Sequence, residues 1–194
     1  MTAKAISSAI TNLTAAEKST RMVAASEIYR QGRVAADRAA SRWWEDVELA
    51  ELLLNPKPIV TVGVAVHRET FARIRAANGQ PALAIVPQEQ DAEEFELHFG
   101  DGVELDVLTS REPAGQGAIA RFLAKFGEGV QQVEFRCLHV DRAMAILRER
   151  FGVAPIYPEA RAGANGSKVN FVLVAVPGAS GESAKALIEL YELP

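Results

Sequence analysis

Cysteine and histidine are scarce in this 194-residue sequence, and long apolar runs are absent. The single cysteine, Cys137, can form no disulfide within the chain, which is typical of a protein of the reducing cytoplasm. No apolar run approaches the roughly 20 residues that a membrane-spanning helix needs, and the amino end lacks the basic cluster and apolar core of a signal peptide. We therefore expect a cytoplasmic protein without a membrane partner.

Clustered positive charge is also missing. The 21 Lys and Arg residues are outnumbered by 25 Asp and Glu residues, which gives a formal net charge of −4. Because nucleic-acid grooves and anionic membrane surfaces are bound through clustered Lys and Arg, the composition argues against both as partners. With 48% hydrophobic and 24% charged residues, the chain has a globular composition rather than a disordered one.

Helix-breaking residues are scarce in the first part of the chain. Of 14 glycines and 9 prolines, only Gly32 and Pro56 lie before residue 58, whereas residues 1–57 hold 12 alanines. Alanine is the best helix former, so residues 1–57 are expected to form a helical extension that precedes a domain of residues 58–194. The extension carries no recognisable chemistry and would cap a site or join two subunits.

Apolar spacing divides this extension into three helical stretches, over about residues 6–13, 14–33 and 37–54. Thr14 and Glu17 fit a capping box at the start of the second stretch, and Gly32 would end or weaken it. Trp43 and Trp44 on the third stretch would dock the helix on the main domain or on a second subunit.

From residue 58 on, short β-rich runs separated by glycine and proline form a pattern that occurs twice. A strand and a helix ending in Gly79 correspond to a strand and a helix ending in Gly152, at a constant offset of about 73 residues. Each helix is followed by three further strand-like runs, at residues 82–86, 95–99 and 103–108 and again at 153–157, 168–175 and 185–191, with Gly178 and Gly181 in the last turn. The order predicts an α+β fold of two tandem βαβββ modules.

Polar side chains alternate with apolar ones along these strands, so each strand has one polar face. Such a face is either solvated or, if the sheet curls, lines a cleft, and periodicity alone does not distinguish the two. The residues concerned are Glu96, His98, Glu104, Asp106, Gln132, Glu134, Arg136, Lys168, Asn170, Glu189 and Tyr191. Away from these faces, His67 and His139 are expected at the surface and Cys137 in the core.

Three segments resemble the methylmalonyl-CoA epimerases of the vicinal oxygen chelate superfamily. Residues 115–135 resemble their S-P-I-A-x-F-L run followed by G-E-G-I-H-H-I-x-F, residues 163–166 their G-x-G-G loop, and residues 186–190 their final V-L-I-E-L strand. The resemblance implies paired modules whose mixed sheets curl around a cleft, a small-molecule substrate or ligand, and a homodimer.

The resemblance also implies a divalent metal held by one ligand from each of four strands. The matching positions are Thr61, Asp106, Gln132 and Glu189, and both histidines of the family pattern are replaced. Asp106, Gln132 and Glu189 remain as oxygen donors, a set that suits magnesium or calcium better than zinc, cobalt or nickel. The cofactor expected is thus a divalent cation at a degenerate site, or none.

The activity that the resemblance implies is epimerase-like or lyase-like, with proton transfer next to a carbonyl of a small carboxylate or acyl-CoA. Glu189 would move one proton, and Glu96 or His98 on the third strand of the first module would move the other. The alternative is a non-catalytic protein of the same fold that binds or sequesters a small molecule, because two of the four family ligands are lost.

Overall fold

The computed structural model describes residues 3–177 and 183–194 of the chain. The chain forms two compact units, each made of two segments: residues 1–32 with 61–131, and residues 33–60 with 132–194. We call them unit 1 and unit 2. In the described part of the chain no helix combines the length and apolar character needed to cross a bilayer.

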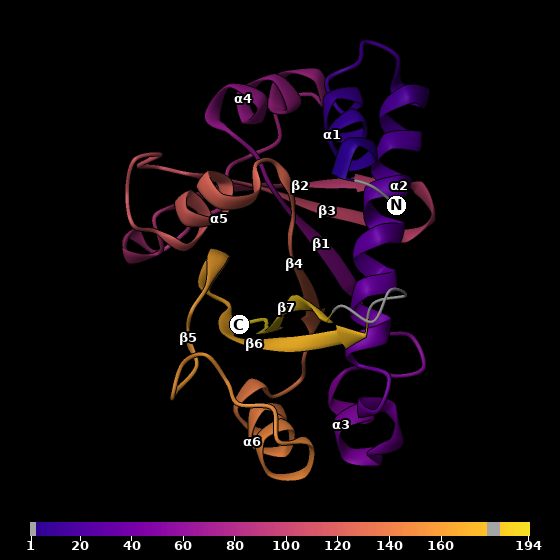
Figure 1. The fold of residues 1–194 in the computed structure, drawn as a ribbon, viewed down its shortest axis with the longest axis vertical. Coiled ribbons are helices and arrows are strands. Elements are labelled where there is room, and N and C mark those ends of the chain that lie inside the picture. Colours follow the sequence, from indigo (N-terminus) through magenta and orange to yellow (C-terminus); the bar gives the residue numbers. More distant parts are fainter. Residues whose placement is uncertain (1–2, 178–182) are drawn as a thin grey trace. The chain divides into compact units, whose positions relative to one another are not determined.

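Unit 1 contains a three-stranded sheet in the order β2-β3-β1, shown with its helices in Figure 1. β2 and β3 are antiparallel, whereas β3 and β1 are parallel. The strands are β1 (Val60–Ala65), β2 (Ala92–Phe99) and β3 (Val103–Ser110), and the helices are α1 (Ala3–Asn12), the first part of α2 (Lys18–Ala39), α4 (Arg68–Ala77) and α5 (Ala118–Phe126). Short 3-10 turns lie at Gln88–Gln90 and Gly100–Gly102.

The apolar faces of these strands meet in the core of unit 1. Register places Val62 beside Leu105 and Phe95 beside Val107, and all four side chains are buried. Phe71 of α4 packs edge-on against Phe95, with ring centroids 4.7 Å apart. The alternation read from the sequence therefore selects the face that the helices cover.

The end of α4 is tied to the amino-terminal helices through Asn78. Its Nδ2 donates to the backbone oxygen of Leu13 at 3.0 Å, and its Oδ1 accepts from Nε of Arg21 at 3.1 Å. Ile10 and Leu13 are fully buried. These helices therefore belong to the core of unit 1.

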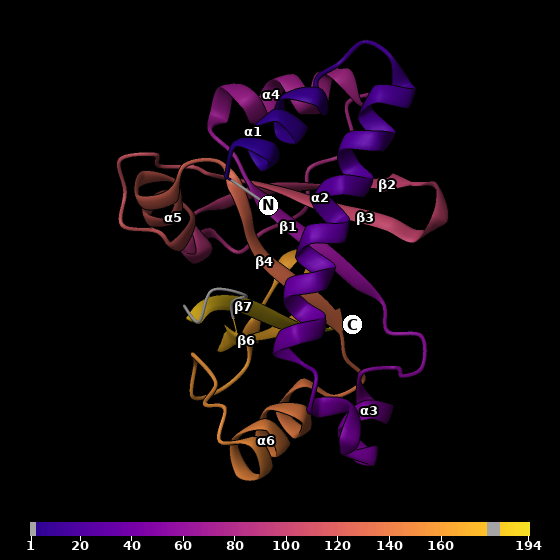
Figure 2. The ribbon, with the colours of Figure 1, turned by 45° about the vertical axis from the view of Figure 1, so that its right-hand side comes forward.

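Unit 2 contains the strands β4, β7, β6 and β5, in that order. β4 and β7 are parallel and the other neighbours are antiparallel. Figure 2 labels β4, β6 and β7. The elements are the 3-10 turn Trp43–Glu45, α3 (Val47–Leu52), β4 (Gly129–Arg136, which enters the unit at residue 132), α6 (Val140–Phe151), β5 (Arg161–Ala162), the 3-10 turn Ala164–Gly166, β6 (Lys168–Pro177) and β7 (Ser183–Glu192).

Ion pairs fasten the 3-10 turn and α3 to α6 within unit 2. Arg142 contacts Glu48 at 2.6 Å, and Arg150 contacts Asp46 at 2.7 Å and Glu48 at 2.8 Å. Trp43 beside them is 2% exposed. This part of the amino-terminal region is therefore packed into unit 2.

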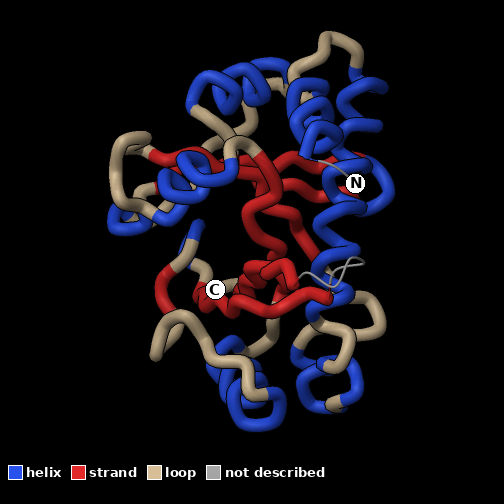
Figure 3. Tube along the Cα trace, in the orientation of Figure 1, coloured by secondary structure: helices blue, strands red, loops and turns tan. Residues whose placement is uncertain are grey.

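Two predicted strands are absent from the described residues. Residues 82–86 form a loop in which N of Ala84 donates to the backbone oxygen of Glu94 in β2 at 3.0 Å, and Pro81 and Pro87 bracket the loop. Residues 153–157 likewise lie in the loop between α6 and β5, with an isolated bridge from Pro155 to Val172. Loops are drawn tan in Figure 3. Proline supplies no N–H to a ladder, which explains both errors.

The helix boundaries differ from the predicted ones at two places. The capping box does not form, because α2 begins at Lys18 and the Thr14 hydroxyl donates to the backbone oxygen of Thr11 instead. Gly32 lies inside α2, where a Cβ would come 2.6 Å from both methyls of Val62. The glycine serves close packing rather than helix termination.

The third helical stretch, predicted over residues 37–54, is interrupted. α2 runs to Ala39, a 3-10 turn follows, and α3 begins only after Asp46, whose carboxylate accepts from the Leu49 backbone N–H at 3.0 Å. An aspartate that caps the amino end of α3 favours a new helix start at residue 47, so the helix does not run continuously over residues 37–54.

The helix repeat is confirmed: α4 is followed by Gly79 at φ +83° and α6 by Gly152 at φ +67°, both in the left-handed region. The α+β class of tandem modules is confirmed as well. The turn predicted at Gly178 and Gly181 lies outside the described residues. The domain boundary at residue 57 stays a prediction.

Candidate active site

One face of the unit 2 sheet gathers three polar side chains from two neighbouring strands. Glu134 of β4 and Glu189 of β7 are register partners, so both side chains stand on the same face. Gln132, two residues before Glu134, shares that face. Gln132 and Glu134 are each 9% exposed, and Glu189 is half-buried.

The amide nitrogen of Gln132 joins the two carboxylates. Its Nε2 donates to Oε1 of Glu134 at 3.0 Å and to Oε2 of Glu189 at 2.6 Å. We call the carboxylates of Glu134 and Glu189, which the Gln132 amide joins, the amide-bridged pair. Hydrogen bonds to charged acceptors are about twice as strong as neutral ones, so the bridge offsets part of the cost of placing two carboxylates side by side.

Aromatic side chains flank Glu189 on its other side. Phe171 of β6 is the register partner of Glu189, and the Tyr157 ring packs edge-on against Phe171 at 6.1 Å. The Arg161 guanidinium lies 3.7 Å from the centre of the Tyr157 ring. The carboxylate thus has a polar neighbour on one strand and an apolar neighbour on the other.

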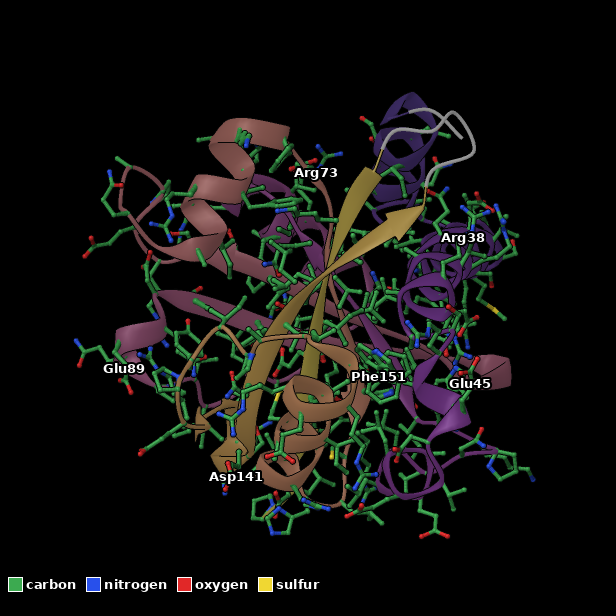
Figure 4. The ribbon with its side chains drawn as sticks, turned by 60° about the horizontal axis from the view of Figure 1, so that its bottom comes forward. Arg38, Glu45, Arg73, Glu89, Asp141 and Phe151 are labelled. Carbon is green, nitrogen blue, oxygen red and sulfur yellow. The ribbon has the colours of Figure 1, made fainter. Side chains whose placement is uncertain are left out.

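Lys168 and Asn170, predicted on the same polar face as Glu189, stand on the opposite face. Their register partners are Glu192 and Leu190, which alternate with Glu189 along β7. Lys168 forms an ion pair with Asp141 at the start of α6, and Figure 4 labels Asp141 and Phe151 at the two ends of that helix. The prediction is wrong because periodicity shows which residues of one strand share a face, but not which face of the neighbouring strand they join. That depends on the register between β6 and β7.

A hollow of about 430 Å³ lies on that opposite face, lined by side chains of α6, β6 and the loop between them. Its lining includes Asp141, Arg148, Glu159 and Lys168, whose charges cancel. Because the hollow opens on the face opposite Glu189, its lining does not include the amide-bridged pair.

In unit 1 the predicted residues occupy the polar face of β2 and β3. Asp106 of β3 is 5% exposed and is the register partner of Glu96. Glu96 pairs with His98 at 3.0 Å, and their side chains are 59% and 61% exposed. Asp106 is therefore enclosed, whereas Glu96 and His98 face solvent within unit 1.

Thr61, the remaining family ligand position, does not resemble a ligand. It is 7% exposed, and its hydroxyl donates to Oε2 of Glu104 at 3.4 Å. A β-branched residue in a buried strand with a hydrogen-bonded hydroxyl serves the structure of the sheet.

Glu94 is a carboxyl group of unit 1 whose pKa is strongly altered. It shares the face of Glu96 and His98 but is half-buried. Burial is the main cause that raises the pKa of Glu94 to about 7, and the negative charge of Glu96 raises it further. The positive charge of Arg111 acts in the opposite direction. A carboxyl group with this pKa can accept and donate protons near neutral pH.

The remaining candidate side chains have the structural roles predicted for them. His67 and His139 are exposed and directly precede α4 and α6. Cys137 is 2% exposed, and burial raises the pKa of its thiol to about 11. A thiol with that pKa is no nucleophile at neutral pH.

The divalent metal that the resemblance implies does not fit the side chains as they are arranged. Within residues 3–177 and 183–194 no group of three or more His, Cys, Asp and Glu side chains could hold a metal ion. In unit 2, Gln132 directs its amide nitrogen, a donor, at both carboxylates instead of offering an oxygen ligand. We therefore derive no step through a metal.

Sequence places Glu134 on a polar face and offers Glu94 on the same strand as Glu96 and His98, but it assigns neither residue a catalytic or metal-binding role. Both stand on the polar faces that alternation identifies, two residues from Gln132 and Glu96 respectively. Alternation gives the face, but strand register and burial single out these two carboxylates.

Comparison with solved structures finds methylmalonyl-CoA epimerases. The enzyme from Mycobacterium tuberculosis is 28% identical over 69% of this chain and 86% of its own, with a TM-score of 0.54. A variant of the Streptomyces coelicolor enzyme in complex with 2-nitronate-propionyl-CoA is 30% identical over 70% of this chain and 96% of its own, with a TM-score of 0.53. A third epimerase structure, in complex with methylmalonyl-CoA and NH4+, is 28% identical over 70% of this chain and 93% of its own, with a TM-score of 0.52.

A scan against protein-family models finds no match, and neither does a search of the curated proteins. The structural likeness agrees with the duplicated module and with the motifs at residues 115–135, 163–166 and 186–190. The chain therefore belongs to the vicinal oxygen chelate superfamily, in which it is similar to the methylmalonyl-CoA epimerases.

Proposed function

We propose that this protein is an epimerase-like enzyme that removes a proton from the carbon next to the carbonyl of an acyl-CoA or small carboxylate and returns one to it. The likeness to several methylmalonyl-CoA epimerases supports an epimerase-like enzyme of the superfamily. Among those structures, one holds methylmalonyl-CoA and others hold 2-nitronate-propionyl-CoA. A nitronate is planar and negatively charged, as an enolate is, so an acyl-CoA is the first substrate class to test.

The observation that carries the proposal is the fixed carboxylate of Glu189. Its Oε2 accepts from Gln132 at 2.6 Å, and it lies between Phe171 and Glu134 in strand register. A carboxylate that is held in place and partly withdrawn from water is suited to act as a general base. In the proposed reaction Glu189 takes the α-proton, and the electron pair of the broken C–H bond moves into the enolate.

The second proton-transfer group returns a proton to the α-carbon. The resemblance assigns it to Glu96 or His98, and Glu94 joins them because its pKa of about 7 allows proton exchange at neutral pH. Asp106 is proposed to contact the substrate, whereas Gln132, whose amide nitrogen donates to Glu134 and Glu189, holds the base in place. Neither assignment needs a metal.

Solvent-exchange labelling tests the proposal. The protein, treated with a chelator, is incubated in D2O with single epimers of methylmalonyl-CoA and with propionyl-CoA, and deuterium at the α-carbon is measured by mass spectrometry. We expect incorporation that Glu189→Gln strongly reduces, whereas Glu149→Gln, at an exposed position of α6, leaves it unchanged. Thermal stabilisation by an acyl-CoA without any exchange would support the non-catalytic binding alternative instead.

We also propose a cytoplasmic homodimer, which the comparisons leave open. Light scattering of the full chain gives its mass in solution, and a mass of one chain at micromolar concentration contradicts the dimer.

A further inference from the structure

We infer that Gln132 and Glu134 form a hydrogen-bonded clamp that positions Glu189 without a metal ion. The inference rests on the proposed function, because it says how the proposed base is held. Gln132 and Glu134 are positioning residues in this view, since both act through Glu189.

The argument begins with the number of hydrogens on the amide. A glutamine side chain has two N–H donors on one nitrogen, and here one carboxylate accepts from that nitrogen at 3.0 Å and the other at 2.6 Å. Two donors for two charged acceptors commit the amide nitrogen fully to Glu134 and Glu189.

The orientation of the amide follows from the same partners. An ionised carboxylate can accept hydrogen bonds but cannot donate them. The nitrogen of Gln132, not its oxygen, therefore faces Glu134 and Glu189. For Gln132 to become a metal ligand, its oxygen would have to turn toward the carboxylates. That turn would replace two attractive contacts by two repulsive ones.

Strand pairing fixes the clamp independently of side-chain rotation. Glu134 and Glu189 are register partners, and Gln132 precedes Glu134 by two residues on the same face. Because Gln132 and Glu134 are each only 9% exposed, water cannot easily replace the amide between the carboxylates. The uncharged amide of Gln132 is therefore the group that holds the carboxylates of Glu134 and Glu189 side by side.

A single substitution converts the clamp into a metal site if this reasoning holds. In the Gln132→His variant an imidazole stands with two carboxylates on one face, a donor set that binds divalent transition metals. We expect the chelator-treated wild-type protein to bind less than 0.1 equivalent of Co²⁺ at roughly micromolar concentration, and Gln132→His to bind about one equivalent with a visible absorption band. Gln132→His combined with Glu189→Gln is the matched control and should lose that band.

Wild-type protein that binds one equivalent of Co²⁺ or Mg²⁺, with an affinity lowered by Glu189→Gln, would overturn the inference. So would a Gln132→His variant that is folded by circular dichroism yet binds no more Co²⁺ than the wild type. Neither result depends on catalysis, so both remain informative if no exchange activity is found.

The role of Glu134 is tested by kinetics and by nuclear magnetic resonance of the side-chain amide of Gln132. Glu134→Gln should lower kcat for α-proton exchange about tenfold at unchanged KM, and Glu134→Asp should recover part of it. In ¹⁵N spectra of the substrate-free protein, Glu134→Gln should speed solvent exchange of the Gln132 NH2 group at least tenfold. A raised KM at unchanged kcat, or unchanged amide exchange, contradicts a positioning role.

Discussion

Glu134 and Glu189 lie side by side as register partners on the parallel strands β4 and β7, and one amide nitrogen, that of Gln132, donates to both. Two like charges in this position destabilise a sheet unless a shared donor holds them. The arrangement therefore favours a role of the pair beyond the packing of unit 2, and the first prediction concerns its half-buried member.

Replacing Glu189 by glutamine should remove the proposed base while keeping its shape. We expect α-proton exchange to fall about 10²–10⁴-fold, the usual contribution of a general base. Deuterium incorporation measures the rate, and the thermal midpoint shows whether the fold is kept. An exchange rate in Glu189→Gln within twofold of the wild type would remove Glu189 from the mechanism.

Glu94 should make unit 1 less stable as pH rises. Its pKa is raised from 4.5 to about 7, so between these values the folded state binds more protons than the unfolded state. The linkage relation then gives a free energy of unfolding that falls as pH increases through this window. The shift corresponds to at most about 3–4 kcal/mol, and partial exposure reduces the expected loss to roughly 1–2 kcal/mol.

Glu94→Gln removes this dependence, so relative to the wild type it should gain stability between pH 4.5 and pH 8 in urea titrations. Glu89→Gln, on an exposed 3-10 turn labelled in Figure 4, is the control. Parallel pH curves for the wild type and Glu94→Gln would contradict the raised pKa.

Gly32→Ala should destabilise the protein although alanine favours helices. The added Cβ would lie 2.6 Å from the methyls of Val62, and overpacking of this kind costs about 1–3 kcal/mol against a helix gain of about 1 kcal/mol. Denaturant unfolding measures the change. In a double-mutant cycle with Val62→Ala the two losses should be less than additive, and strict additivity would show that the two sites do not touch.

Arg150→Gln should loosen α3 from α6 and change the acid stability of unit 2. Hydrogen bonds from Arg150 and Arg142 lower the pKa of Asp46 and of Glu48, respectively. Lowered carboxyl pKa values give stability that is present above the unfolded values of 3.8 and 4.5 and is lost as pH falls through the folded values. The variant should therefore lose less stability on acidification.

Hydrogen exchange at pH 7 should in addition show faster exchange of amides in α3 of Arg150→Gln. Arg148→Gln, whose partner Glu149 lies 3.8 Å away on the same helix, is the control. Equal protection of α3 in Arg150→Gln and the wild type would show that apolar packing alone holds it.

Local patterns predicted the repeated helices and the long strands well. The glycines after α4 and α6 and the sequence alternation that predicts β2, β3 and β4 are local signals, and each of these helix ends and strands appears in the structure near the expected place. The strand expected at residues 82–86 failed because Pro81 and Pro87 interrupt the ladder, and such a run is locally indistinguishable from an edge strand.

The site could be predicted only in part, for a different reason. Alternation places Gln132 and Glu134 on one face, but that face holds Glu189 and not Asn170 because of strand register, which is a long-range property. Burial likewise separates Glu94 from Glu96, two residues apart on the same face of β2.

β2 is the outermost strand of the unit 1 sheet, and a loop whose Ala84 N–H donates to the Glu94 backbone oxygen lies along it. An open strand edge invites pairing with other chains, and proline-bracketed irregular segments block such pairing. Pro81 and Pro87, which offer no backbone N–H, therefore leave this edge less suited to pairing with a strand of another chain.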